Sequence, residues 1–491
     1  MPTKSIAVHE SQHNTHIFSS LSPSGRTMTK LPLLPTFLLL FSTVNGGPTS
    51  AAREQWGYAE VRPKAHMFWW LYRSPWRVEG SQPWPIILWL QGGPGASGVA
   101  IGNFQEIGPL DTDLKPRAST WLRVADLLFV DCPVGTGYSY VENKSLLVKT
   151  DEEAAKDLTK LLSQLFNGNR DLQKSPIYIV AESYGGRFAA TLALKASDAI
   201  ENGTLKAKLG GVALGDSWIS PEDYVLSWGP LLRDVSRLDA VGAAAADTLA
   251  KKIKQQIEDK QYVAATSSWS SLETQISSNS NSVDFYNFLL DSEMDTLSPT
   301  AVMRSYGNYI SRMRSSPDSG GSGDPMDRLM NGVIREKLKI IPPGVRWGGQ
   351  SDDVFEMMNG EFMRARIEEV DKLLARGLNL TIYNGQLDVI CSTKGTEAWL
   401  SKLRWGGMAD FQRSEKRALY CGGDRRTRGF TKSFQNLRFY WILGAGHFVP
   451  VDQPCVALDM LRSITQSPAV RPPTKGGHSH SHANLSASGR R

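Results

Sequence analysis

The sequence predicts an α/β fold, in which helices cover a mainly parallel sheet. Short apolar runs rich in β-branched and aromatic residues are each followed by turn residues, as buried parallel strands are. These runs span residues 86–90, 127–130, 177–180, 212–214, 378–383 and 437–443. A helical pattern from Asp151 to Phe166 lies between the second and third runs, and Thr150 with Glu153 forms a capping box at its start. This alternation of strand and helix implies an α/β sheet.

A second region interrupts that alternation. The chain has 491 residues, 41% of them hydrophobic, which is enough to bury a large core. Residues 221–343 combine serine-rich linkers with helical stretches such as 240–260, and we expect a mainly helical insertion. It divides the α/β core into a first part, 48–220, and a second part, 344–467. Residues 468–491 lack apolar periodicity and are expected to be disordered.

The N-terminal region, residues 1–47, carries a targeting signal. Lys30 precedes an apolar run of 11 residues, 31–41, and small residues follow, which is the pattern of a secretory signal peptide. Met28 begins an ordinary n-region, so we expect it to be the natural start and the region to be cleaved. The run is short and contains Pro35, whereas a membrane span takes roughly 20 residues. The alternative is a buried core segment. We expect a secreted or lysosomal protein with no stable membrane anchor.

Composition excludes other partners. The net charge of +6 is spread thinly, and no arginine-rich helix, zinc-finger spacing or basic block precedes the C-terminal tail. We therefore expect no nucleic-acid partner. The tail histidines His478, His480 and His482 have no carboxylate or cysteine beside them, so we expect no metal site, and no cofactor is predicted.

Ser183 has the sequence context of a nucleophile elbow. Residues 177–186 run from a predicted strand through a tight turn into a predicted helix, 187–196. The turn needs small residues on both sides of the serine, and Ala181 and Gly185 meet that need. A small-x-Ser-x-Gly match alone is more often an ordinary loop serine, so the assignment depends on downstream residues.

Two downstream segments supply the partners of that serine. Asp388 follows the strand at 378–383 and His447 follows the strand at 437–443, each at the carboxyl end, where open sheets place their sites. The chain order Ser, Asp, His is that of α/β-hydrolases. We therefore predict an α/β-hydrolase fold with a mainly helical insertion, or cap, and a catalytic triad of Ser183, Asp388 and His447.

A glycine-rich loop follows the predicted strand at residues 86–90. In residues 91–95, bare backbone lets N–H groups approach a developing negative charge. Such a loop also suits phosphate, but the lysine and Ser/Thr of a P-loop are missing, which disfavours a nucleotide.

Modification sites fit an oxidising compartment. Glycosylation sequons begin at Asn143, Asn202, Asn379 and Asn484, and each is a candidate if exposed. The four cysteines allow three pairings. We favour Cys391 with Cys421, because both lie between Asp388 and His447. The alternative for Cys132 and Cys455 is that both are buried free thiols.

Several motifs together resemble the serine carboxypeptidase family. The resemblance runs from about Trp56 to Gln466 and is highly specific in combination. The motifs are WLQGGPG at 89–95, DCPVGTGYSY at 131–140, ESYGG at 182–186, GDSWIS at 215–220, NGQLD at 384–388 and GHFVP at 446–450. It implies that Ser183 is the nucleophile, that His447 is the general base and acid, and that Asp388 orients the imidazole. It also implies an oxyanion hole made by the backbone N–H groups of Gly93 and Tyr184.

The resemblance further implies a site for the free C-terminal carboxylate of a substrate, made by Gln91, Gly92, Glu106 and Glu182. Gln91 departs from the usual Asn, and Ala96 departs from a common cysteine. Two acidic groups held close share a proton, and the protonated one donates a hydrogen bond, which predicts acidic working conditions. The alternative is that both glutamates are solvated surface acids.

These residues predict a serine-type carboxypeptidase that hydrolyses the C-terminal bond of peptides and proteins through an acyl-enzyme. One alternative is an acyltransferase or esterase with the same triad, because one fold hosts many chemistries. A second is a non-catalytic binding or protective protein on the same scaffold. Retention of both glutamates favours the peptide substrate, and the intact triad argues against the second alternative. Side-chain preference and oligomeric state are not predicted.

Overall fold

The structure is a computed structural model that describes residues 7–11, 53–78, 83–292 and 325–469. The predicted signal run 31–41, Asn484, the tail histidines and nearly all of the predicted disordered tail lie outside these residues. Within the described ranges, no helix has the length and apolar character needed to cross a bilayer.

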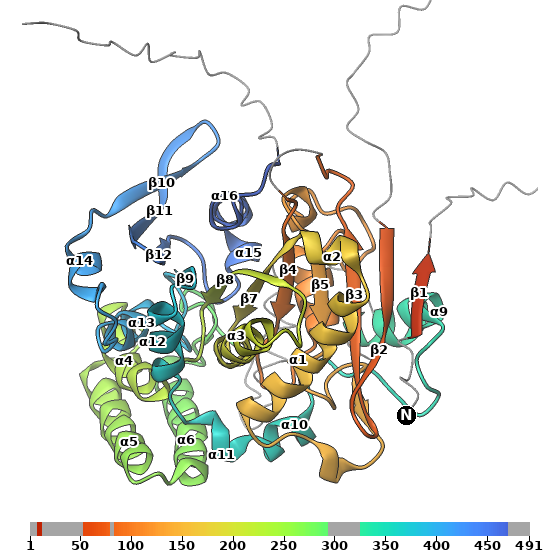
Figure 1. Ribbon diagram of the computed structural model, residues 1–491. Coiled ribbons are helices and arrows are strands. Elements are labelled where there is room, and N and C mark those ends of the chain that lie inside the picture. The colour runs from red at the N-terminus through yellow and green to blue at the C-terminus, as the bar shows by residue number, and fades with distance from the viewer. Residues whose placement is uncertain (1–6, 12–52, 79–82, 293–324, 470–491) are drawn as a thin grey trace, which may run out of the picture.

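A sheet of 12 strands runs through the molecule (Figure 1). Its order is β1-β2-β3-β5-β4-β7-β8-β9-β12-β11-β10, and β6 pairs with β3 beside this path. The central strands from β5 to β12 are parallel, and antiparallel strands flank them on both sides. The bounds are β1 Ala7–Ser11, β2 Arg53–Arg62, β3 Ala65–Arg73, β4 Ile86–Leu90, β5 Asp126–Val130, β6 Tyr140–Val141, β7 Pro176–Glu182, β8 Lys208–Gly215, β9 Leu380–Gly385, β10 Arg417–Cys421, β11 Asp424–Phe434 and β12 Leu437–Ile442.

Helices cover both faces of this sheet and extend beyond one end of it (Figure 1). The α-helices are α1 Asp151–Asn167, α2 Arg170–Lys174, α3 Gly185–Glu201, α4 Pro221–Asp234, α5 Ala240–Glu258, α6 Tyr262–Ser280, α8 Pro325–Leu329, α9 Arg335–Leu338, α10 Asp352–Met357, α11 Asn359–Phe362, α12 Ile367–Ala375, α13 Thr393–Leu400, α14 Met408–Arg413, α15 Val449–Asp452 and α16 Pro454–Thr465. Two π-helices, η1 Gly98–Ile107 and η4 Met330–Ile334, and two short 3₁₀ turns, η2 Trp121–Arg123 and η3 Lys144–Leu146, complete the described elements.

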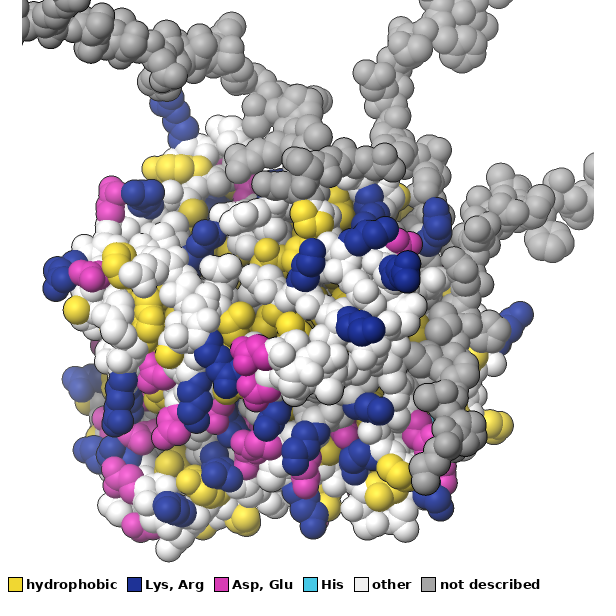
Figure 2. All heavy atoms as spheres, in the orientation of Figure 1, with side chains coloured by type: hydrophobic (Ala, Val, Ile, Leu, Met, Phe, Trp, Pro, Cys, Tyr) yellow, Lys and Arg dark blue, Asp and Glu magenta, His cyan; other side chains and the backbone are white. Residues whose placement is uncertain are grey.

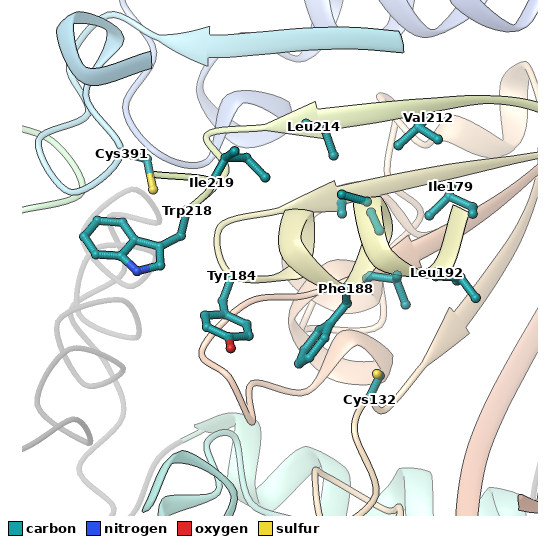
Figure 3. Packing of buried hydrophobic residues seen from close by; sticks show 14 of the residues in the cluster. Cys132, Ile179, Tyr184, Phe188, Leu192, Val212, Leu214, Trp218, Ile219 and Cys391 are labelled. Carbon is teal, nitrogen blue, oxygen red and sulfur yellow. The ribbon is translucent and has the colours of Figure 1, made fainter. Parts of the chain in front are cut away.

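Strand β4 shows why the central strands lack polar alternation. All five of its residues are buried, because successive side chains point to opposite faces and both faces are covered. Leu88 belongs to the core on the side of α1, α3 and α12, whereas Trp89 belongs to the core on the side of η1, α15 and α16. In Figure 3, Phe188 and Leu192 of α3 lie against the strands that carry Ile179 and Val212. The architecture is the α/β-hydrolase fold that the sequence predicts.

The helices α4, α5 and α6 form a bundle at one end of the molecule (Figure 1). Helix α11, which follows in the second part of the chain, packs against α6. Figure 2 shows basic and acidic side chains interspersed over the lower part of this face, where α5 and α6 lie, so that part carries no patch of a single charge. That residues 221–343 fold as an insertion of their own stays a prediction.

The cysteine pairing predicted from the sequence is wrong. Cys421, at the end of β10, is bonded to Cys455, in the first turn of α16. Cys391 is a free, buried thiol in the loop after Asp388, so it cannot reach the hairpin at the edge of the sheet. The free-thiol alternative is correct for Cys132, which is buried, and wrong for Cys455.

The three described sequons lie at the surface. Asn143, Asn202 and Asn379 are all exposed, so each is accessible to a glycan. Glycosylation of these residues stays a prediction.

The disulfide closes a loop of 34 residues between an edge strand and a helix. We expect Cys421→Ser and Cys455→Ser each to lower the free energy of unfolding by about 2–4 kcal/mol, because the unfolded chain regains the closed loop's entropy. Denaturant unfolding measures this loss. The double variant should lose no more than either single variant, since all three lack the same bond. A non-reduced peptide map that joins Cys391 to Cys421 would show this pairing to be wrong.

Candidate active site

Ser183 occupies a sharp turn between β7 and α3. Its φ angle is +60°, in the left-handed region that non-glycine residues seldom adopt. The Ser183 N–H donates to the carbonyls of Gly215 and Asp216, both at 3.1 Å. A Cβ on Gly185 would lie 2.2 Å from the carbonyl oxygen of Leu90, so only glycine fits there. This strained turn presents the Ser183 side chain at the carboxyl end of the sheet.

Asp388 and His447 are brought together by two neighbouring strands. Asp388 lies in the loop after β9, and His447 follows β12, the strand beside it. His447 Nδ1 and Asp388 Oδ2 are 2.8 Å apart. The second oxygen of Asp388 accepts the backbone N–H of Cys391 at 3.1 Å, and the N–H of His447 donates to the carbonyl of Tyr286 at 2.8 Å. Both side chains are buried, so their mutual orientation is fixed.

The glycine-rich loop lies directly over Ser183. A Cβ on Gly92 would lie 2.5 Å from Ser183 Cβ and 2.8 Å from its Oγ, so the loop approaches only because it has no side chain there. Gly93 has a φ of +105°, and Tyr184 precedes the first turn of α3. Gly93 and Tyr184 line the same cavity as Ser183. A helix N-terminus and bare backbone N–H groups both favour a developing negative charge.

Glu106 and Glu182 form a buried pair beside this loop. Glu182 ends β7 and Glu106 lies on η1, and the two buried carboxyl groups are close enough for the charge of Glu106 to act on Glu182. Gln91 Nε2 donates to Glu182 Oε1 at 2.8 Å, and Gln91 Oε1 accepts from Trp89 Nε1 at 2.7 Å. No described residue donates to Glu182 Oε2 or to either oxygen of Glu106. The prediction of solvated surface acids is therefore wrong for both glutamates.

Burial sets the protonation of this pair. It raises the pKa of Glu106 from its ordinary value of 4.5 to about 7. Burial, followed by the charge of Glu106, raises the pKa of Glu182 well above its ordinary value. Because two adjacent buried carboxylates repel each other, at least one of them holds a proton at mildly acidic pH.

An open cavity of about 670 Å³ joins these groups. Ser183, His447, Gln91, Gly92 and Glu182 line it, together with a wall of Trp218, Trp269, Tyr286, Phe355 and Phe362. Phe362 is the centre of that wall. Its ring stacks on those of Trp218 and Tyr184, with ring centroids 5.4 Å and 5.8 Å apart. Figure 3 shows Trp218 and Tyr184 projecting from the turns after β8 and β7 toward this region. The aromatic wall was not predicted from the sequence, because its residues come from helices and loops far apart in the chain.

A buried ion network holds the start of α3. The Tyr184 hydroxyl donates to Asp151 at 2.8 Å, and Arg187 pairs with the same carboxylate at 3.0 Å. Arg366 also binds Asp151, at 2.8 Å, and pairs with Glu361. These buried charges are compensated by one another and connect α1, α3 and α12 behind the elbow. Sequence analysis gave no signal for this network beyond the capping box of α1.

The glutamate pair makes a prediction about stability. Since burial raises both pKa values, their contribution is fully present below pH 4.5 and is lost as pH rises through about 7. We expect the thermal midpoint to fall between pH 5 and 7.5, and to fall less in Glu182→Gln, which leaves Glu106 beside a neutral amide.

Glu201→Gln is the matched control, because Glu201 is exposed at the end of α3. The thermal midpoint of Glu201→Gln should fall as far as that of the wild type between pH 5 and 7.5. If the thermal midpoint of Glu182→Gln fell as far as that of the wild type over the same pH range, the pair would not be protonated in the folded state.

Comparison with known proteins agrees with this geometry. Residues 46–467 match the family model described as serine carboxypeptidase. Serine carboxypeptidase-like 51 of Arabidopsis thaliana is 61% identical over 457 residues, covering 90% of this chain and 99% of that protein. Retinoid-inducible serine carboxypeptidase of Homo sapiens is 44% identical over 450 residues, covering 91% of this chain and 98% of that protein.

A solved structure shares the fold. It is that of KEX1ΔP, a prohormone-processing carboxypeptidase from Saccharomyces cerevisiae, with a TM-score of 0.71 and 19% identity. The match covers 84% of this chain and 91% of that chain. On the family model and these two relatives, the chain belongs to the serine carboxypeptidase family.

Proposed function

We propose that this chain removes single residues from the C-termini of peptides and proteins through an acyl-enzyme on Ser183. The observation that carries the proposal is the buried pair of Glu106 and Glu182 beside the nucleophile, in which Glu182 accepts a hydrogen bond from Gln91. A site that binds a free carboxylate beside Ser183 selects the last peptide bond of a substrate chain. An enzyme that hydrolyses neutral esters does not need a site that binds a free carboxylate.

The proposed reaction starts with attack by Ser183 Oγ on the scissile carbonyl. His447 takes the serine proton on Nε2, because Nδ1 faces Asp388, and Asp388 stabilises the imidazolium that forms. The backbone N–H groups of Gly93 and Tyr184 stabilise the oxyanion. His447 then gives its proton to the leaving amine, and water hydrolyses the acyl-enzyme by the same steps in reverse.

The carboxylate site works through hydrogen bonds. A protonated member of the Glu106 and Glu182 pair donates to the substrate carboxylate, whereas two ionised glutamates would repel it. Gln91 uses one Nε2 hydrogen for Glu182 and its Oε1 for Trp89, which fixes the amide and leaves the second hydrogen for the substrate. The backbone of Gly92 is accessible in the same cavity. Glutamine therefore takes over the usual role of asparagine at this position.

The aromatic wall supports apolar substrate side chains. Trp218, Trp269 and Phe362 present rings to the cavity beside Ser183. Burial of a large apolar side chain against such rings contributes about 1.5–3 kcal/mol. We expect residues with large apolar side chains next to the scissile bond to be preferred.

The proposed compartment is the secretory pathway, either outside the cell or in an acidic organelle. The disulfide between Cys421 and Cys455 and the exposed sequons support an oxidising environment. The raised pKa of Glu106 supports acidic working conditions.

Substitution of the nucleophile tests the mechanism. We expect Ser183→Ala to lower turnover by roughly 10⁴-fold or more and to abolish labelling by a fluorophosphonate, because no other oxygen is placed to attack. His447→Ala and Asp388→Asn should also lower the rate without unfolding the protein. Labelling of Ser183→Ala at the wild-type rate would disprove the assignment.

The pH profile tests the carboxylate site. We expect hydrolysis of N-blocked dipeptides to decline as pH rises through about 7, because the glutamate pair loses its proton. Esters or amides without a terminal carboxylate should be hydrolysed to higher pH, because their binding does not need a proton on the glutamate pair. Glu182→Gln, which donates without titrating, should move the peptide profile toward neutral pH.

Amidation of the substrate C-terminus provides the matched control. It should reduce dipeptide cleavage more than truncation of the far end does. Coincident profiles for peptide and ester, unmoved by Glu182→Gln, would contradict the proton-sharing site.

A further inference from the structure

Asp216 belongs to the GDSWIS motif, and the proposed reaction gives its side chain no role. It follows β8 directly, is 1% exposed, and has a φ of +40°. Its backbone N–H donates to the carbonyl of Tyr383 at 2.9 Å, and its carbonyl accepts the N–H of Ser183 at 3.1 Å. The main chain of Asp216 therefore joins the nucleophile's turn to β9, the strand that leads to Asp388.

The side chain of Asp216 points into the same junction. Its Oδ1 accepts the backbone N–H of Gly385 at 2.7 Å. Its Oδ2 is buried, and no described residue donates to it. Asp388 lies beside it, since the backbone N–H of Asp388 donates to the carbonyl of the same Gly385 at 3.4 Å, and the charge of Asp388 acts on the Asp216 carboxyl group. A buried oxygen that has no donor and lies near a second carboxylate is satisfied only if it carries a proton and donates it.

The contacts of Asp388 decide which of the two carries it. Asp388 Oδ2 faces His447 Nδ1 at 2.8 Å, and Oδ1 accepts the N–H of Cys391 at 3.1 Å. Asp388 thus has two donors and faces the imidazole that becomes positive during catalysis. Asp216 has one donor, the N–H of Gly385, and no cationic side chain lies beside it among the described residues. The negative charge belongs on Asp388 and the proton on Asp216.

We propose that Asp216 is a positioning residue, which remains protonated and donates a hydrogen bond from Oδ2 to the carboxylate of Asp388. This bond holds Asp388 in the orientation that binds His447 Nδ1, and it leaves a single negative charge beside the imidazole. The inference rests on the proposed triad chemistry.

The surroundings of Asp216 favour its neutral form. Burial, followed by the charge of Asp388, raises the pKa of Asp216 well above its ordinary value. The other groups that face it are acidic, and they come from three directions: Asp452 of α15, Glu182 of β7, and Tyr383 with Cys391 on and after β9. A second ionised carboxylate at this place would be unfavourable.

Paired substitutions test the role of the proton. Asp216→Asn keeps an oxygen for Gly385 and gives Asp388 an N–H donor, so it should keep kcat/KM for an ester substrate within about threefold. Asp216→Ala removes the donor and should lower kcat by roughly 10- to 100-fold with little change in KM, as the loss of a hydrogen bond to a buried charge does. An ester is used because it does not engage Glu106 and Glu182.

The acid limb of the ester profile reports the charge of Asp216. A protonated Asp216 and an asparagine are both neutral, so Asp216→Asn should leave the acid limb within about 0.3 pH unit of wild type. If Asp216 were ionised in the working enzyme, Asp216→Asn would remove a negative charge near His447. The acid limb would then move to lower pH by about one unit or more, which would overturn the proposal.

Asp131→Asn is the matched control for stability. Asp131 is also buried, but it accepts three hydrogen bonds, from Ser97 Oγ and from the backbone N–H groups of Val99 and Tyr138. An amide at that place sets donor against donor and should lower the thermal midpoint by several degrees. Asp216→Asn should leave the midpoint nearly unchanged, and an equal drop in both variants would show that Asp216 is an ionised acceptor.

Ser183→Ala separates this inference from the proposed function. If Ser183→Ala still hydrolyses the ester, the triad assignment has failed and the Asp216 inference fails with it. If Ser183→Ala is inactive while Asp216→Asn and Asp216→Ala lose activity equally, the proposed function stands and the role of the Asp216 proton is wrong.

Discussion

Four carboxyl groups are buried at the carboxyl end of the sheet, and this apolar site cannot hold all four as anions. Glu182, Asp216 and Asp388 lie at or just after the ends of three adjacent strands, β7, β8 and β9, and Glu106 faces Glu182 from η1. In each pair, burial and the neighbouring carboxyl group raise a pKa, and we propose that each pair holds one proton. In the proposed mechanism, the placement of these protons governs both the binding of substrate and the orientation of the triad.

The two pairs use the same physical constraint in different ways. In the pair of Glu106 and Glu182, the proton is available to a substrate that brings its own carboxylate. In the pair of Asp216 and Asp388, the proposed proton is kept inside the protein, where it holds the carboxylate that faces His447. The strained turn at Ser183 lies between the two pairs, with its N–H bonded to Gly215 and Asp216. The reaction proposed for Ser183 thus depends on a proton in each of the two pairs.

The strands that position the site could be predicted from the sequence, because burial on both faces gives continuous apolar runs. Ile86–Leu90 is predicted residue for residue, and the bounds of the other runs lie within four residues of the observed ones. Six strands were missed, namely β1, β2, β3, β6, β10 and β11. Of these, β10 and β11 are largely exposed at the edge of the sheet and carry many charged residues. The disulfide was mispredicted because α16, far along the chain, brings Cys455 to this edge.

The site was predicted where short motifs carry it and missed where packing makes it. Ser183, Asp388 and His447 each follow a strand, so strand order alone brings them together. The wall residues Trp269 and Phe362 lie on helices whose packing no local pattern predicts. The role proposed for Asp216 depends on burial and on one missing donor, and neither is visible in the sequence.

The central claim is that a proton shared by Glu106 and Glu182 binds the substrate carboxylate. It is tested most directly by calorimetry of peptide binding to Ser183→Ala near pH 7.5, in buffers of different ionisation enthalpy. Near that pH the pair is partly ionised, because the pKa of Glu106 is about 7. Binding of an N-blocked dipeptide should then take up as much as one proton, whereas its C-terminal amide should take up none. Equal proton uptake by the two ligands, or none by either, would contradict the account.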